Sequence, residues 1–257
     1  MVTGIDKFRE YFADFNGSYV IIGGTACDII EEEAGQTPRA TKDIDIILIV
    51  EALTPEFVGQ FWNFIAAGSY TTRQRSNGTN EYFRFLKPQT KGFPLQIELF
   101  SRKPDVLDID KASTLTPIPA DDDLSSLSAI LMNDQYYSFT LEHSQLADDI
   151  RIAKSPSLIC LKVKAYLDLS SRKTIGEHVD EKNIRKHLND VFRLAATLAE
   201  ADQFFLPDEI KADLTQFCQI VSKALPDGAI FRSAGLASIN SKDVFDRLCA
   251  AFQVNLQ

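Results

Sequence analysis

The stretch from Tyr19 to Val50 constrains the fold of this chain more than any other part of the sequence. It opens with an apolar run, Tyr19 to Ile22, which is typical of a buried strand. The run breaks at Gly23-Gly24, and the pattern that follows predicts a helix from about Thr25 to Glu33. A strand that turns directly into a helix leaves unpaired backbone N–H groups at the helix N-terminus, where phosphate oxygens can bind. We therefore expect an α/β fold with a candidate phosphate site at Gly23-Gly24.

Three acidic residues are expected to meet beside this turn. Asp43 and Asp45 alternate along a second predicted strand, so their side chains point to the same side. Glu98 comes from a later strand, Leu95 to Phe100, whose alternate aliphatic residues, beginning with Leu95, are expected to face a helix layer while Glu98 emerges opposite. At about 4–5 Å, each ionised pair would repel by roughly 3–4 kcal/mol at an effective dielectric of about 20. The arrangement predicts a divalent cation, Mg²⁺ or Mn²⁺, as cofactor.

Each of these residues also has a plainer interpretation. Thr41-Lys42-Asp43 could be a surface turn before a buried strand, but Asp45 would then be hard to explain, because an acid in an aliphatic run is seldom buried without partners. Thr25 could cap the helix alone or contact a phosphate as well. Glu98 could ligate a metal, act as a base toward the incoming hydroxyl, or do neither.

The spacing of these residues resembles that of a known superfamily. Gly23-Gly24-Thr25, then Asp43-x-Asp45, then the lone acid Glu98 on a strand, resemble the DNA polymerase β-type nucleotidyltransferases. Gly24-Thr25 replaces the usual Gly-Ser and keeps the hydroxyl, while Glu98 stands where Asp is commoner. The resemblance implies a metal-dependent enzyme that moves a nucleoside monophosphate from an NTP to an acceptor.

The second half of the chain narrows the resemblance. Leu161-Lys162-x-x-Ala165-x-Leu167-Asp168, followed by Lys186-His187-x-x-Asp190-Val191, looks like the AbiEii/AbiGii toxin branch of that superfamily. The branch implies that Lys162 contacts nucleotide phosphates and that Asp190 is the acid of a second lobe. It also implies a tRNA or protein acceptor, and a toxin that is held in check by a separate antitoxin protein.

The residues themselves leave both of these roles open. On a helix, the neighbours of Lys162 one turn away are apolar or aromatic, so its ammonium must reach a partner or snorkel to solvent. Asp190 has Lys186 and Arg193 at i−4 and i+3, and it could equally be a helix salt-bridge residue.

The order of the expected elements predicts two lobes. Residues 1–104 read as a nucleotidyltransferase-type α/β catalytic lobe, with helices packed on a mixed sheet. Residues 105–257 read as a mostly helical lobe that closes the cleft. The expected hairpins are Ser69 to Arg75 with Glu81 to Leu86, and Ser128 to Met132 with Tyr136 to Leu141. The other expected helices are Ile5 to Phe15, one capped by Thr54, Pro156 to Leu169, Glu181 to Glu200, Pro207 to Ala224 and Ser241 to Phe252.

Charge and cysteine usage limit the class of protein. A formal net charge of −9 argues against static nucleic-acid binding through phosphate contacts. A local basic rim of Arg39, Arg73, Arg75, Arg84 and Lys87 could still accept an RNA end, or it could consist of solvated sheet-edge charges. Four cysteines without a CxxC pair read as reduced thiols. With no secretory signal and no apolar run of about 20 residues, we expect a cytoplasmic protein that does not cross a membrane.

Two other functions stay open from the sequence. A non-catalytic member of the fold could serve as a partner in a regulatory or defence complex, which Glu98 and the acidic net charge favour. Transfer to a small molecule such as an aminoglycoside is a third interpretation, and it would leave the basic rim unused.

Overall fold

The structure is a computed structural model that describes residues 3–72, 82–100 and 133–256. Its contacts divide the chain into two compact units. The first unit contains residues 1–28, 39–121 and 144–153, and the second contains residues 29–38, 122–143 and 154–257. The predicted lobe boundary at residue 104 lies outside the described residues and stays a prediction.

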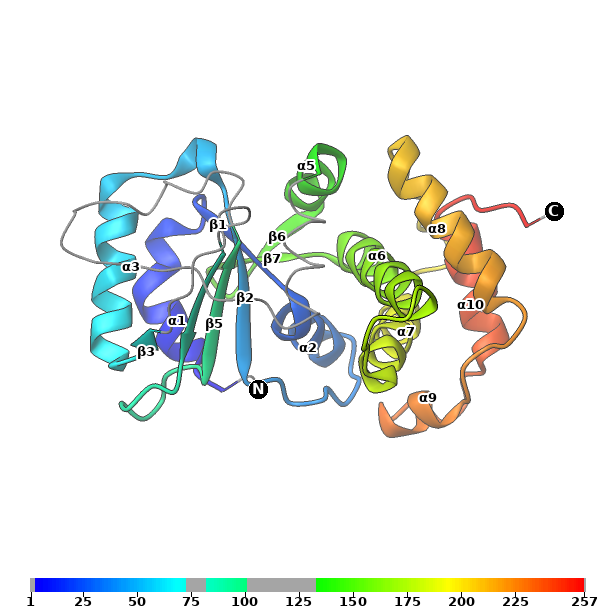
Figure 1. The fold of residues 1–257 in the computed structure, drawn as a ribbon, viewed down its shortest axis with the longest axis horizontal. Coiled ribbons are helices and arrows are strands. Elements are labelled where there is room, and N and C mark those ends of the chain that lie inside the picture. The colour runs from blue at the N-terminus through cyan, green and yellow to red at the C-terminus, as the bar shows by residue number, and fades with distance from the viewer. Residues whose placement is uncertain (1–2, 73–81, 101–132, 257) are drawn as a thin grey trace. The chain divides into compact units, whose positions relative to one another are not determined.

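The first unit is built on a seven-stranded mixed sheet with the order β3-β4-β5-β2-β1-β7-β6 (Figure 1). The β1–β2 pair is antiparallel, whereas the β2–β5 and β1–β7 pairs are parallel. The prediction of an α/β fold with a mixed sheet is therefore confirmed. The strands are β1 (Tyr19–Ile22), β2 (Asp43–Leu48), β3 (Thr71–Thr72), β4 (Tyr82–Leu86), β5 (Gln96–Phe100), β6 (Ser144–Ala147) and β7 (Ile150–Ala153).

One face of this sheet carries an aromatic core. The helices α1 (Ile5–Phe12) and α3 (Pro55–Gly68) cover this face, and a 3₁₀ turn (Ala13–Phe15) follows α1 (Figure 1). The Thr54 side chain accepts a hydrogen bond from Phe57 N at 3.2 Å and caps α3, as the sequence predicts. The rings that pack between the helices and the sheet are Phe8, Phe12, Tyr19, Phe57, Phe61, Phe64 and Phe85. Because these rings fill one face, polar side chains of the same strands are directed to the other.

The second unit is helical. The helix α6 packs against α7 and α8, and α7 packs against α10. Their cores are apolar, with Leu158, Phe192, Phe217 and Leu248 fully or almost fully buried. The helices are α5 (Asp134–Glu142), α6 (Ser155–Thr174), α7 (Glu181–Ala195), α8 (Asp208–Val221), α9 (Ala229–Ser233) and α10 (Ser241–Ala251). None of the helices that the structure describes has both the length and the apolar character that crossing a bilayer requires.

The segment Tyr136 to Leu141, predicted as a strand, lies instead in α5. Asn133 caps this helix by accepting hydrogen bonds from Gln135 N and Tyr136 N, and this cap outweighs the strand preference of the aromatic run. The hairpin in this part of the chain is β6–β7, which the sequence analysis missed. Its turn places both Asp148 and Asp149 at positive φ, a conformation that Asp tolerates better than most residues.

Other predictions differ in their bounds or lie outside the described residues. Leu95 precedes β5 and is 46% exposed, so the expectation that it faces a helix layer is wrong. The predicted strand Ser128 to Met132 lies outside the described residues, as do the residues that join β3 to β4, including the expected Asn77-Gly78 turn.

Candidate functional site

The structure brings Asp43, Asp45 and Glu98 to one face of the sheet. Asp45 on β2 is the register partner of Glu98 on β5, and Asp43 is the partner of Gln96. Side chains of in-register partners project to the same face, which here is opposite to the aromatic core. The carboxyls of Asp45 and Glu98 lie within hydrogen-bonding reach of each other. We call Asp43, Asp45 and Glu98 the carboxylate row.

Burial makes Glu98 the most strongly perturbed acid of this row. Glu98 is 5% exposed, whereas Asp43 and Asp45 are half-buried. Burial and the negative charge of Asp45 raise the pKa of Glu98 to about 8, although the Arg84 guanidinium acts in the opposite direction. At neutral pH, Glu98 therefore keeps a proton unless a further positive charge compensates the row.

Two neighbours hold one oxygen of Glu98. Arg84 Nε on β4 donates a hydrogen bond to Glu98 Oε1 at 2.8 Å, and the Gln96 side-chain amide donates to the same oxygen. The interpretation of Arg84 as a solvated edge charge is therefore wrong, because its side chain is only 13% exposed and is ion-paired. Arg73 and Arg75 of the proposed rim lie outside the described residues.

The glycine turn lies directly against the carboxylate row. The helix α2 (Gly23–Glu33) begins immediately after β1, and Gly23 has a φ of 66°, a conformation that favours glycine. A Cβ on Gly23 would overlap the Asp45 carboxylate, and a Cβ on Gly24 would lie 2.8 Å from Thr41 Oγ1. Both glycines are half-buried, so they are not sealed under packed side chains.

Thr25 does not cap α2, because the helix begins two residues earlier, at Gly23. Its fully buried side chain donates a hydrogen bond from Oγ1 to the main-chain oxygen of Asp43 at 2.5 Å. Asp28, one turn further along α2, accepts a hydrogen bond from Thr41 N at 2.5 Å. These two bonds fix the start of β2 against α2 and so position Asp43.

The carboxylate row fits a divalent cation through two of its members. Carboxylates are ligands that Mg²⁺ and Mn²⁺ prefer, and Asp43 and Asp45 point to one side of β2. Within residues 3–72, 82–100 and 133–256, no three His, Cys, Asp or Glu side chains form a group that could hold a metal ion. Among these residues Glu98 is thus not part of a three-carboxylate group, and its Oε1 accepts hydrogen bonds from Arg84 and Gln96.

In the second unit, Lys162 and Asp190 pair with each other. Lys162 Nζ on α6 lies 3.1 Å from Asp190 Oδ2 on α7, and their side chains are 9% and 1% exposed. The ammonium therefore reaches a partner, as the sequence requires, and does not snorkel to solvent. Arg193, the other predicted neighbour of Asp190, instead binds Glu31.

The Glu31–Arg193 pair is a buried contact that the sequence analysis missed. Arg193 Nε and Nη2 donate to the two carboxylate oxygens of Glu31 at 3.0 and 2.5 Å, and Nη2 also donates to Thr37 O. Both side chains are less than 5% exposed. This bidentate pair joins the end of α2 to α7 within the second unit, across a sequence separation too large for local patterns to reveal.

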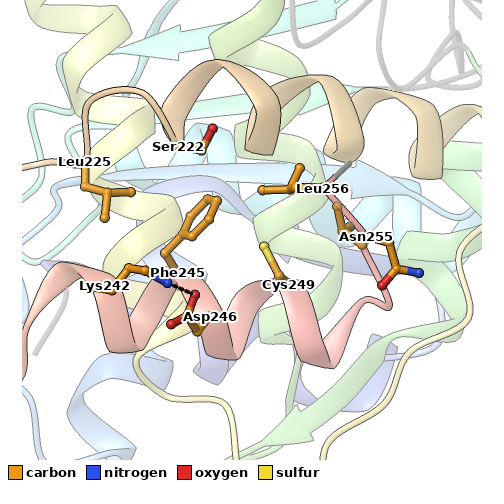
Figure 2. Close-up of a pocket in the computed structure, with 9 residues that line it drawn as sticks. Ser222, Leu225, Lys242, Phe245, Asp246, Cys249, Asn255 and Leu256 are labelled. Atoms are coloured by element: carbon orange, nitrogen blue, oxygen red, sulfur yellow. Dashed lines mark hydrogen bonds and ion pairs between the residues drawn. The ribbon is translucent and has the colours of Figure 1, made fainter.

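A pocket of about 410 Å³ lies between α8, α10 and the residues that follow α10 (Figure 2). Lys242 and Asp246 form an ion pair in its lining, and the Cys249 thiol also lines it. A hydrogen bond from the buried Cys218 thiol lowers the pKa of Cys249. None of the predicted site residues lines this pocket. The four cysteines are free thiols, and three of them are buried.

Comparisons with known proteins leave the family open. No protein-family model matches this chain, and no curated protein sequence matches it. Among solved structures, the crystal structure of an antigenic nucleotidyltransferase-like protein from Paracoccidioides brasiliensis is similar to it with a TM-score of 0.43. The alignment has 14% identity and covers 95% of this chain and 99% of the other. Because a similarity this low does not establish a shared fold, we assign no function from it.

Proposed function

We propose that this protein is a metal-dependent nucleotidyltransferase that moves a nucleoside monophosphate from an NTP to an acceptor. The observation that carries the proposal is the position of the carboxylate row, directly against the glycine turn at the start of α2. A helix start supplies unpaired N–H groups for phosphates, and the adjacent acids supply ligands for a divalent cation. Nucleotidyl transfer needs these two features next to each other.

In this proposal each residue of the first unit has a specific role. The main chain at Gly23 and Gly24 binds triphosphate oxygens, because neither residue has a side chain to block their approach. Asp43 and Asp45 hold Mg²⁺ or Mn²⁺, and Thr25 keeps Asp43 in place through its main-chain oxygen. When bound, the cation neutralises negative charge on the phosphate oxygens. Glu98 keeps the Asp45 carboxyl oriented from the neighbouring strand.

The motifs around Lys162 and Asp190 support a narrower proposal. By their resemblance to the AbiEii/AbiGii branch, we propose a cytoplasmic toxin whose acceptor is a tRNA or a protein and whose partner is an antitoxin. Lys162 would contact a nucleotide phosphate. Its pairing with Asp190 is compatible with that role, because an ammonium has three N–H donors.

A transfer assay tests the proposal. The chain is incubated with each α-³²P-labelled NTP, with Mg²⁺ or Mn²⁺, and with total tRNA or a cell lysate as acceptor. We expect label to enter one acceptor class with the wild-type chain and not with Asp45→Asn, which keeps the side-chain volume but removes a charge. If no NTP yields labelled product and none binds the folded chain in calorimetry, the proposal is wrong.

One observation favours a second candidate function. Glu98 is held by Arg84 and Gln96, and the described residues contain no three-carboxylate group. A non-catalytic member of the fold, acting as a partner in a regulatory or defence complex, would need no such group. In that case NTP could bind without transfer, and the Asp45→Asn chain would retain the biological effect of the wild type.

A further inference from the structure

The positive charge of Arg84 lies at one end of the carboxylate row, next to Glu98. Arg84 on β4 is the register partner of Glu98 on β5, and Glu98 is in turn the partner of Asp45 on β2. The three side chains therefore follow one another across adjacent strands on one sheet face. The side chains of Arg84 and Glu98 are 13% and 7% exposed, so solvent screens their 2.8 Å contact only weakly.

The hydrogen bonds at Glu98 leave little capacity for a metal at one of its oxygens. A carboxylate oxygen has two lone-pair directions, and Oε1 accepts from both the Arg84 guanidinium and the Gln96 amide. The Asp45 carboxyl lies within hydrogen-bonding reach of the same Glu98 side chain. Glu98 is thus surrounded by Arg84, Gln96 and Asp45, which orient it within the sheet.

The charges of the row also favour a single bound cation. Asp43 and Asp45 stand beside the pair that Glu98 makes with Arg84, and their two carboxylates match the charge of one divalent cation. A second divalent cation would leave an excess of two positive charges before any nucleotide binds. With Arg84 in place, the row is therefore matched to one ion.

From this geometry we infer that Arg84 is a built-in counter-ion of Glu98, so that in the absence of nucleotide Asp43 and Asp45 bind a single divalent cation and Glu98 does not ligate it. The inference rests on the proposed function, because it concerns the cation that function needs. Glu98 is then a positioning residue for Asp45.

Counting bound Mn²⁺ by electron paramagnetic resonance tests this inference. The full chain is titrated with Mn²⁺ without nucleotide, and free Mn²⁺ is measured from its signal. We expect one Mn²⁺ per wild-type chain. Arg84→Gln removes the counter-ion, so it should bind a second Mn²⁺ or bind the first about tenfold more tightly. If a folded Arg84→Gln chain shows neither of these changes, the inference is overturned.

A charge-neutral double variant keeps the test decisive if Arg84→Gln alone does not fold. Arg84→Gln combined with Glu98→Gln removes both partners without changing the net charge of the row. If Glu98 is not a ligand, the double variant keeps one Mn²⁺ with affinity within about threefold of the wild type. A loss of more than about tenfold would show that Glu98 is a ligand and would overturn the inference.

Matched controls separate this inference from the proposed function. Arg151→Gln removes another part-buried arginine of the same sheet, whose hydrogen bonds go to Asn16 O and Ser144 Oγ and not to an acid. It should bind Mn²⁺ as the wild type does, and Asp45→Asn should bind none. Two Mn²⁺ on the wild-type chain would overturn the inference alone. No Mn²⁺ on the wild-type chain would overturn the proposed function as well.

Discussion

Buried charge is arranged differently in the two units of this protein. In the second unit, Glu31 is bound by Arg193, and Asp190 is paired with Lys162. In the first unit, the carboxylate row sets three acids against the guanidinium of Arg84. Each pair joins one acid to one base, whereas in the row Asp43 and Asp45 stand beside the pair that Glu98 makes with Arg84. We interpret the pairs as contacts that stabilise the fold, and we propose that the row binds a ligand.

The largest expected effect concerns the Glu31–Arg193 pair. Arg193→Met leaves the Glu31 carboxylate buried without its bidentate partner, so the free energy of unfolding should fall by about 3–5 kcal/mol. Urea denaturation followed by circular dichroism measures it. Replacing the whole pair, with Glu31→Leu and Arg193→Met together, should recover much of the loss. A single-variant loss below about 1 kcal/mol, as for an exposed pair, would contradict the assignment of this pair as a buried contact.

The Lys162–Asp190 pair should behave in the same way with a somewhat smaller effect. Lys162→Met should lower the free energy of unfolding by about 3 kcal/mol, because Asp190 is 1% exposed and loses the ammonium that lies 3.1 Å from it. Lys164→Met is the matched control on the same helix. Lys164 lies 2.7 Å from Asp213 but its side chain is 28% exposed, so its loss should cost at most about 1 kcal/mol. Equal losses of stability in Lys162→Met and Lys164→Met would contradict the distinction between a buried and a partly exposed ion pair.

Gly23→Ala tests the packing of the glycine turn against Asp45. The residue has a positive φ, and the new Cβ would meet the Asp45 carboxylate, so we expect a loss of about 1–3 kcal/mol. Gly17→Ala is the control, since a Cβ at this residue would meet no atom of the described residues within 4 Å, and it should stay within about 0.5 kcal/mol of the wild type. A Gly23→Ala chain that is as stable as the wild type would mean that the turn does not enclose Asp45.

The carboxylate row should also make the stability depend on pH through Glu98. The pKa of Glu98 is raised from 4.5 to about 8, so between these values the folded chain holds a proton that the unfolded chain has released. Stability should therefore fall as pH rises through this window in EDTA, and the fall should be complete above about pH 8. Glu98→Gln should remove this contribution. Urea denaturation at several pH values measures both, and parallel curves for the two chains would contradict the raised pKa.

Local patterns were sufficient to predict the part of the fold that surrounds the site. The apolar run before Gly23, the alternation of Asp43 with Asp45 and the cap at Thr54 each depend on residues close in sequence. The aromatic run in α5 was misread because a strand preference competes with a capped helix over the same residues. The β6–β7 turn was missed because Asp148-Asp149 lacks the glycine that usually marks such a turn.

The partners of the buried charges were harder to predict than the charges themselves. The stripe around Lys162 indicated that its ammonium needs a partner, but the choice of Asp190 depends on how α6 packs against α7. The contact between Arg193 and Glu31 likewise depends on tertiary packing. The Arg84–Glu98 pair follows from the register of β4 and β5, which local sequence patterns do not determine.

The stability of the wild-type chain and of Asp45→Asn, each in EDTA and in excess Mg²⁺, tests the central claim most directly. If the carboxylate row is a cation site, Asp45→Asn should be as stable as the wild type or more stable in EDTA, because one repelling charge is removed. Mg²⁺ at about 100 times its Kd should add about 2.7 kcal/mol to the wild type and nothing to the variant. An Asp45→Asn chain that is destabilised in EDTA, together with a wild type that Mg²⁺ does not stabilise, would contradict the claim.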